Sequence, residues 1–196
     1  MNLQRIWAMP SADTFDIPPF GELVKRYLRQ SKVSVDPFSR NKRWATWTND
    51  LNPETAAEYH FDAFEFLKML QGDGIAPDLV IFDPPYSRQQ VKEVYAGIGR
   101  HYGIQDTQDH STNWHKERDI IDQILVPGGC VMSFGWNSSG MGKGRGYKPL
   151  ELIIINHGGA HNDTICIVEQ KQALQLSFHT PPSNKGMKPN CYSPNY

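Results

Sequence analysis

Residues 79–86 read Leu79-Val80-Ile81-Phe82-Asp83-Pro84-Pro85-Tyr86. The first four form a short apolar run, which predicts a strand that is buried on both faces of a sheet. An acid, two prolines and an aromatic ring follow directly, and prolines end regular structure because they lack a backbone N–H. We therefore expect residues 83–86 to lie at the carboxyl end of a strand, which is where open α/β sheets bind ligands.

These four end residues suit a flat base that carries an amino group. Asp83 can accept a hydrogen bond from an amine, and Tyr86 offers a ring face. Pro85 disfavours helix at the residue before it, so the Pro84 carbonyl is left without a helical partner. Such a site would hold a base that has swung out of a nucleic-acid helix. A simple strand terminator explains the tetrapeptide equally well, so the rest of the chain has to decide.

The composition indicates one compact domain. The chain has 196 residues, of which 39% are hydrophobic and 21% charged, and this balance argues against wholesale disorder. We expect a single domain over residues 1–172 and an extended or disordered tail over 173–196, which is rich in Pro, Asn, Ser and Lys. No apolar run approaches the roughly 20 residues that span a bilayer. The amino terminus lacks a secretory signal and the three cysteines show no Cys-x-x-Cys spacing, so we expect a cytoplasmic protein without membrane partners.

Apolar runs alternate with segments of helical period along the chain. This alternation predicts an α/β fold with a mostly parallel sheet. Strands are expected at 32–35, 44–48, 79–82, 130–134, 150–155 and 164–169, and helices at 20–28, 61–70, 88–98 and 114–125. The last two strands are predicted to form an antiparallel pair at the sheet edge.

The tetrapeptide resembles the catalytic motif of S-adenosylmethionine-dependent amino-methyltransferases, in this form most typically adenine-N6 DNA methyltransferases. Similar tetrapeptides occur in ribosomal RNA guanine-N2 methyltransferases and, with Asn first, in protein glutamine methyltransferases. Residues 7–171 are also similar to small phage-type adenine-specific DNA methyltransferases in the order and spacing of their sequence features. The resemblance implies a Rossmann-like class I methyltransferase fold with helices on both faces of the sheet. It also implies S-adenosylmethionine as cofactor, DNA as substrate and a role in protecting phage DNA from restriction.

Four acids at or near predicted strand ends and a helix start suit this cofactor, whose ammonium, ribose diol and adenine amine are all hydrogen-bond donors. Singly, each acid fits a turn or a cap just as well. The resemblance implies that Asp36 begins the first cofactor loop, Asp50 binds the ribose and Asp62 meets the adenine. It also places the methionine carboxylate at residues 11–15. The expected cofactor-binding residues are Thr14, Phe15, Asp36, Pro37, Phe38, Asp50, Asp62, Ala63 and Asp83.

One departure from the family pattern falls in the first cofactor loop. Where the family usually has Phe-x-Gly-x-Gly, this chain has Phe38 followed by Ser39, Arg40 and Asn41. Both glycines are missing, although Asn41 tolerates left-handed backbone geometry better than most residues.

The resemblance implies direct in-line methyl transfer without a metal. Asp83 and the Pro84 carbonyl would accept the two N–H bonds of the adenine N6 amine. Tyr86, together with Phe134 or Trp136, would sandwich the base, although a core position explains Trp136 equally well. His157 and His161 have no third ligand at supporting spacing, so no metal site is predicted. The predicted catalytic residues are Asp83, Pro84, Pro85 and Tyr86, and the predicted nucleic-acid contacts are Tyr86, Trp136, Lys143, Arg145, Arg40 and Lys42.

The net charge of −1 leaves the substrate open, because proteins that bind DNA mainly through phosphates are usually basic. Only residues 100–112 and 137–147 form insertions large enough to contact nucleic acid, with a second subunit of a homodimer as one way to complete a groove. RNA or a protein amide is an alternative substrate. A non-catalytic nucleic-acid-binding partner of the same fold is the alternative from another class.

Overall fold

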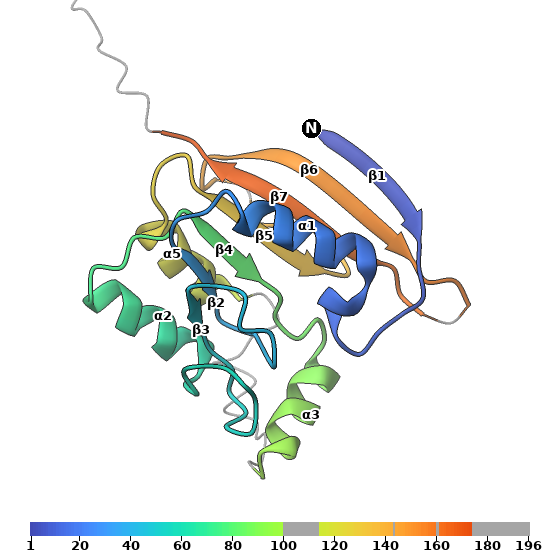
Figure 1. The fold of residues 1–196 in the computed structure, drawn as a ribbon, viewed down its shortest axis with the longest axis horizontal. Helices are drawn as coiled ribbons and strands as arrows, with labels where there is room; N and C mark the ends of the chain where they lie inside the picture. The colour runs from blue at the N-terminus through green and yellow to red at the C-terminus, as the bar shows by residue number, and fades with distance from the viewer. Residues whose placement is uncertain (100–113, 143, 160, 174–196) are drawn as a thin grey trace, which may run out of the picture.

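The computed structural model describes residues 1–99, 114–142, 144–159 and 161–173. Within these ranges the chain forms a seven-stranded sheet in the order β1-β6-β7-β5-β4-β2-β3 (Figure 1). The strands are β1 (Asn2–Trp7), β2 (Ser34–Asp36), β3 (Trp47–Thr48), β4 (Leu79–Phe82), β5 (Cys130–Gly135), β6 (Tyr147–Asn156) and β7 (Thr164–Lys171). The helices are η1 (Thr14–Asp16), α1 (Pro18–Leu28), α2 (Ala63–Gly72), α3 (Arg88–Gly97) and α5 (His115–Ile124).

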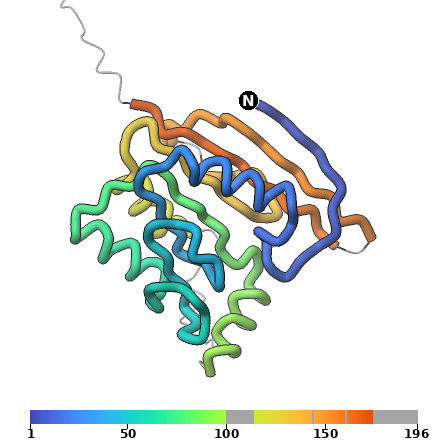
Figure 2. The backbone as a smooth tube through the Cα atoms, viewed as in Figure 1, coloured from blue at the N-terminus to red at the C-terminus, as the bar shows by residue number. Residues whose placement is uncertain are grey.

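The sheet confirms the predicted fold class. Strand β7 is antiparallel to both β5 and β6, and every other neighbouring pair is parallel in the described part of the chain. The expected hairpin is therefore β6 with β7. Strand β1 lies beyond it and pairs with β6, so β6 separates the first and the last strand of the described chain (Figure 2).

The edge strand β1 is the one strand that the sequence did not predict. Its side chains are exposed apart from Ile6, so it shows no buried apolar alternation. It is held by backbone pairing with β6, in register from Asn2 opposite Glu151 to Trp7 opposite Asn156. Long-range pairing of this kind leaves no mark in local sequence.

Two apolar layers cover the two faces of the sheet. Alternate residues of β4 divide between them, because successive side chains of a strand point to opposite faces. Leu79 and Ile81 pack against η1 and α1, whereas Val80 and Phe82 pack against α2 and α5. Helices therefore lie on both faces, as expected. No helix in the described ranges is long and apolar enough to cross a membrane.

The glycine-rich crossover, residues 136–146, connects β5 to β6. Met141 in this segment is fully buried, and its N–H donates to Glu169 of β7 at 2.6 Å. Gly140 is left-handed, with φ of 52°, and a Cβ there would lie 1.9 Å from a Glu169 carboxylate oxygen. The crossover is thus packed against the sheet, and only glycine fits at this position.

Candidate active site

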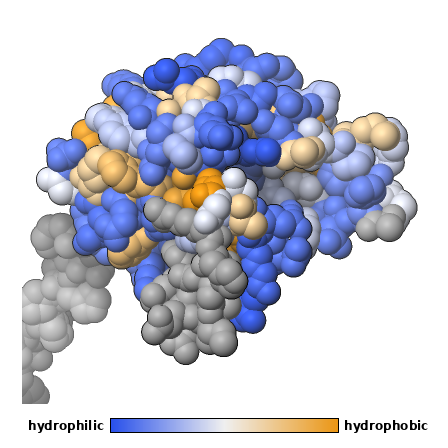
Figure 3. All heavy atoms as spheres, turned by 90° about the horizontal axis from the view of Figure 1, so that it is seen from below, coloured by the Kyte–Doolittle hydropathy of each residue, from blue (hydrophilic) through white to orange (hydrophobic). Residues whose placement is uncertain are grey.

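A cavity of about 530 Å³ lies at the carboxyl ends of β2 and β4. Its other walls come from the chain before η1, the start of α2 and the inner side of α3, which projects from the body (Figure 1). Figure 3 views this end of the molecule and shows apolar residues near the middle of a mostly hydrophilic face. A volume of this size suits a small organic ligand.

Asp83 lies where β4 ends and faces into this cavity together with Pro84 and Pro85. Its Oδ1 accepts a hydrogen bond of 2.5 Å from the Tyr86 hydroxyl, whose oxygen is also 3.2 Å from Thr14 Oγ1. Burial raises the pKa of Asp83 to about 6. Hydrogen bonds with Tyr86 and Thr14 favour the carboxylate and lower the pKa, but they offset only part of this rise. Asp83 is therefore ionised at neutral pH but takes up a proton in mildly acidic solution.

The tetrapeptide leads straight into α3, and its capping fixes Tyr86. The Ser87 hydroxyl accepts from the Gln90 N–H at 3.2 Å, and the Gln90 side chain accepts from the Tyr86 N–H at 2.6 Å. This exchange resembles a capping box, which holds the first turn of a helix to the chain before it. The cap therefore ties the Asp-Pro-Pro-Tyr tetrapeptide to the helix that forms one wall of the cavity.

Asn49 links the loops that carry the other acids. Its side chain is fully buried, donates to the Pro37 and Phe61 carbonyls at 3.1 and 3.0 Å, and accepts from the Phe61 N–H at 2.9 Å. Asp36 ends β2 close by, and its Oδ1 accepts from the Phe38 N–H at 3.0 Å. Burial raises the pKa of Asp36 well above its ordinary value. Asp36 is thus a buried turn residue, whereas Pro37 and Phe38 reach the cavity.

Asp50 and Asp62 both line the cavity. Asp50 accepts backbone N–H groups from Asn52 and Arg40 at 2.9 and 3.1 Å, and burial nevertheless raises its pKa. Asp62 caps α2, because its Oδ1 accepts from the Phe64 N–H at 2.9 Å. Ala63, the first residue of α2, also lines the cavity. Each acid therefore has a structural hydrogen bond and a position from which it can meet a ligand.

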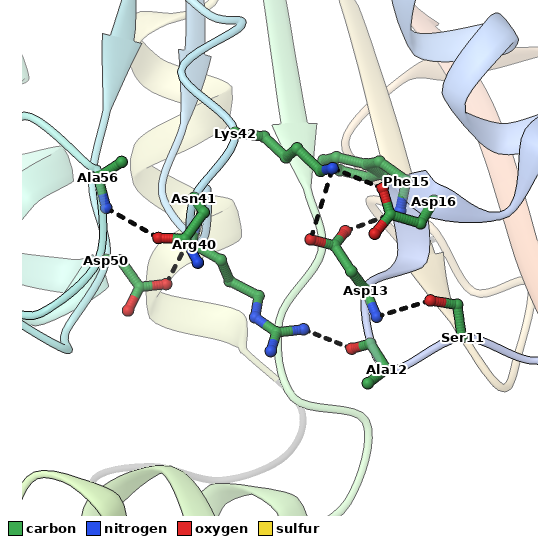
Figure 4. Close-up of polar contacts among 10 residues, drawn as sticks. All are labelled: Ser11, Ala12, Asp13, Phe15, Asp16, Arg40, Asn41, Lys42, Asp50 and Ala56. Atoms are coloured by element: carbon green, nitrogen blue, oxygen red, sulfur yellow. Dashed lines mark hydrogen bonds and ion pairs between the residues drawn. The ribbon is translucent and has the colours of Figure 1, made fainter.

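Arg40 and Lys42 turn toward the chain before α1 (Figure 4). The Arg40 guanidinium donates to the Ala12 carbonyl and lines the cavity. Lys42 is paired with Asp16 at 2.5 Å and lies 4.0 Å from Asp13, outside the cavity wall. Both residues were predicted to contact nucleic acid. In the structure, each of them contacts the chain before α1.

The cavity unites most of the predicted cofactor and catalytic residues. Those that line it are Thr14, Pro37, Phe38, Asp50, Asp62, Ala63, Asp83, Pro84 and Pro85. Of the other predicted residues, Phe15 is 6% exposed and packs against Trp44 and Phe134, so its side chain belongs to the core. Trp136 is 40% exposed and contacts the Tyr86 ring edge-on, with centroids 5.8 Å apart.

The remaining predicted nucleic-acid residues do not join the cavity. Arg145 pairs with Asp119 of α5 at 2.5 Å and donates to the Met141 carbonyl at 2.5 Å, on the crossover. Lys143, the predicted loop at 100–112 and the tail from 174 lie outside the described residues.

No group of three or more His, Cys, Asp or Glu side chains in the described ranges is arranged to hold a metal ion.

Several lining residues were not predicted as site residues, among them Trp114, Val94 and Tyr95. Trp114 has a left-handed backbone, with φ of 47°, and its ring packs edge-on against Phe38 with centroids 5.3 Å apart. Val94 and Tyr95 reach the cavity from α3. The sequence predicted the helix that contains Val94 and Tyr95. It could not predict that they line the cavity, because this depends on the direction in which α3 leaves β4.

Comparison with known proteins supports the fold. No family model matches the sequence, and no curated protein matches it. The chain is similar to the solved structure of yhhF from Escherichia coli, assigned as a methyltransferase, with a TM-score of 0.51 and 12% identity over 85% of this chain and 92% of that one. It is similar to TrmN from Thermus thermophilus with a TM-score of 0.50 and 13% identity, over 79% of this chain.

The chain spans about half the length of TrmN, 49%. These likenesses, together with the strand order and the antiparallel β7, show a Rossmann-like fold of the class I methyltransferase type.

Proposed function

We propose that the protein is an S-adenosylmethionine-dependent methyltransferase that modifies the N6 amine of adenine in DNA. One observation carries the proposal. Asp83, in an Asp-Pro-Pro-Tyr tetrapeptide, opens into the same cavity as Asp50 and Asp62. Asp83, which can accept a hydrogen bond from the amine, therefore shares one cavity with Asp50 and Asp62, which can accept hydrogen bonds from the cofactor.

The charges of the cavity fit this cofactor. Among the described lining residues, four carboxyl groups face one guanidinium: Asp50, Asp62, Asp83 and Glu93 against Arg40. S-adenosylmethionine carries a sulfonium and an ammonium against one carboxylate, so its net charge complements an acidic cavity. A nucleoside phosphate would be repelled by the same charges.

The chain's own groups would act on the amine. The lone pair of an aromatic amine is delocalised into its ring, and acceptors on both N–H bonds would turn that lone pair toward an electrophile. Asp83 offers one acceptor and the Pro84 carbonyl is assigned the other. S-adenosylmethionine supplies the electrophilic methyl group when bound. Positioning of this kind accounts for roughly 7–11 kcal/mol of a barrier in favourable cases, and the charge of Asp83 would stabilise the developing ammonium.

The first cofactor loop bears on the non-catalytic alternative. Arg40 has φ of 50°, a left-handed geometry that glycine adopts most readily, and it stands where the family pattern has its first glycine. The turn is therefore made without glycine, which supports cofactor binding over an inert subunit.

Transfer of labelled methyl groups tests the proposal. We expect incorporation into unmethylated double-stranded DNA, with N6-methyladenine as the product after nuclease digestion, and little incorporation into RNA or protein. Asp83→Ala should lower the rate at least about 100-fold while S-adenosylhomocysteine still binds within a few-fold. Asp73→Ala, at the exposed end of α2, is the matched control. Incorporation into RNA or protein alone would reassign the substrate, and full activity of Asp83→Ala would overturn the assigned role.

A further inference from the structure

Arg40 combines an unusual backbone with an unusual position. It is one of two non-glycine residues with positive φ in the described ranges, the other being Trp114. Its N–H donates to Asp50 Oδ2 at 3.1 Å, and its guanidinium donates to the Ala12 carbonyl. Figure 4 shows its side chain extending from the Asp50 side of the site toward the chain before η1. An L residue is strained in this conformation, so the side chain needs a reason to be there.

The charges of the cavity make Arg40 distinctive. It is the one basic residue among the described lining residues, against four acids. The neighbouring Lys42 does not line the cavity and is paired with Asp16. A guanidinium has five N–H donors in a planar fork, and the bond to Ala12 uses one of them. A ligand with an anionic group would therefore find its cationic partner at Arg40.

We propose that Arg40 binds the carboxylate of the amino-acid part of the cofactor, an inference that rests on the function proposed above. S-adenosylmethionine has one anionic group, and the cavity offers one guanidinium among its described walls. A guanidinium matches a carboxylate with two parallel hydrogen bonds, which lysine cannot reproduce. The carboxylates of the cavity are then available to accept hydrogen bonds from the ammonium, the ribose diol and the adenine amine of the cofactor.

The competing explanation is that Arg40 only holds the chain before η1 in place through Ala12. Both explanations predict weaker ligand binding when Arg40 is changed. They differ in which part of the ligand matters. If Arg40 only holds the chain before η1 in place (the latch), its loss would lower the affinity for every ligand of the cavity alike. If Arg40 binds the carboxylate, its loss would lower the affinity only for ligands that carry the carboxylate.

Calorimetry on the full chain separates the two with S-adenosylmethionine and its decarboxylated analogue, which lacks only the carboxylate. We expect the unmodified protein to prefer the carboxylated ligand. Arg40→Gln should weaken that ligand about 10-fold to 100-fold, the range of a hydrogen bond to a charged group, and leave the analogue within about two-fold. Arg43→Gln, an exposed neighbour with the same charge change, should alter neither affinity.

Equal weakening of both ligands by Arg40→Gln would overturn the proposal in favour of the latch. If Arg40→Gln melts far below the unmodified protein, Arg40→Lys takes its place, with selective but smaller weakening as the supporting result and equal weakening as the contrary one. Failure of the unmodified protein to bind either ligand would instead refute the proposed function and this inference with it.

Discussion

The Tyr86 hydroxyl donates to Asp83 Oδ1 at 2.5 Å, so the two ends of the Asp-Pro-Pro-Tyr tetrapeptide are joined to each other. The same hydroxyl lies 3.2 Å from Thr14 Oγ1. Tyr86 was predicted to act through its ring face. The Tyr86 hydroxyl also occupies one oxygen of the Asp83 carboxylate, the group that is proposed to bind the amine, and this bond favours the charged form of Asp83.

Tyr86→Phe should therefore change the pH dependence of methyl transfer. The amine needs an ionised Asp83, so activity should rise with pH through a midpoint near the Asp83 pKa of about 6. Removing the donor makes the carboxylate less stable and raises that pKa, so the midpoint should move to higher pH by about one unit.

Rates measured between pH 5 and 9 at saturating cofactor and DNA would show this shift. Charged and polar groups near Asp83 include Asp13, Arg40 and Thr14, and all of them stay in place in this variant. Thr14→Val, which removes the second partner of the hydroxyl, should move the midpoint less. An unchanged midpoint in Tyr86→Phe would mean that the hydroxyl does not control the ionisation of Asp83.

Asp50→Ala should weaken cofactor binding far more than DNA binding. The change removes a partly buried carboxylate from the cavity and the acceptor of the Arg40 N–H. We expect about a 10-fold to 100-fold loss of affinity for S-adenosylhomocysteine by calorimetry. DNA affinity, from fluorescence anisotropy, should change less than about three-fold by the same argument. The reverse pattern would count against the assignment of Asp50 to the cofactor ribose.

Asn49→Ala should destabilise the protein and open the site. It leaves the Pro37 and Phe61 carbonyls and the Phe61 N–H without their buried partner. A buried polar group without a partner costs about 1–3 kcal/mol, so we expect a loss of at least about 3 kcal/mol in the free energy of unfolding. Urea titration would measure it.

The control for Asn49→Ala is Asn52→Ala, in a nearby turn, where one exposed bond to the Glu54 N–H is lost. That change should cost about 0.5–1 kcal/mol. Equal losses in the two variants would show that Asn49 does not link the loops of the site.

Gly21→Ala should destabilise the protein although alanine favours helix. A Cβ at Gly21 in α1 would lie 2.6 Å from the Phe15 carbonyl oxygen, in a backbone that has little room to move. Forcing such a contact costs about 1–3 kcal/mol. Gly72→Ala is the matched control, because no atom lies within 4 Å of its added Cβ and alanine gains up to about 1 kcal/mol in a helix. A higher melting temperature for Gly21→Ala would contradict the close approach of η1 and α1.

Local sequence was enough for most of the fold. The apolar run at Leu79–Phe82 became β4, buried throughout, since its pattern of side chains needed no long-range information. Pro18 and Pro19 opened α1, and Asp62 capped α2, as their intrinsic preferences predict. Strand ends also placed Asp50 and Asp83 in one cavity, because parallel strands bring their carboxyl ends to a common edge.

Tertiary structure decided what depends on distant partners. Strand β1 exists because β6 offers it an edge, and Asn49 matters because three loops meet around it. The pairing of Lys42 with Asp16, 26 residues earlier in the chain, is likewise set by tertiary structure, while the predicted nucleic-acid contact of Lys42 stays a prediction.

The sequence by itself determined which acids lie at the strand ends and helix start around the cavity, because period, capping and proline act within a few residues. Only the folded chain decided where the Tyr86 hydroxyl and the Arg40 guanidinium point, because both directions are set by hydrogen bonds to Asp83, Thr14 and Ala12. The contacts with Thr14 and Ala12 join segments that are distant in sequence, so they form only after the sheet has brought their elements together.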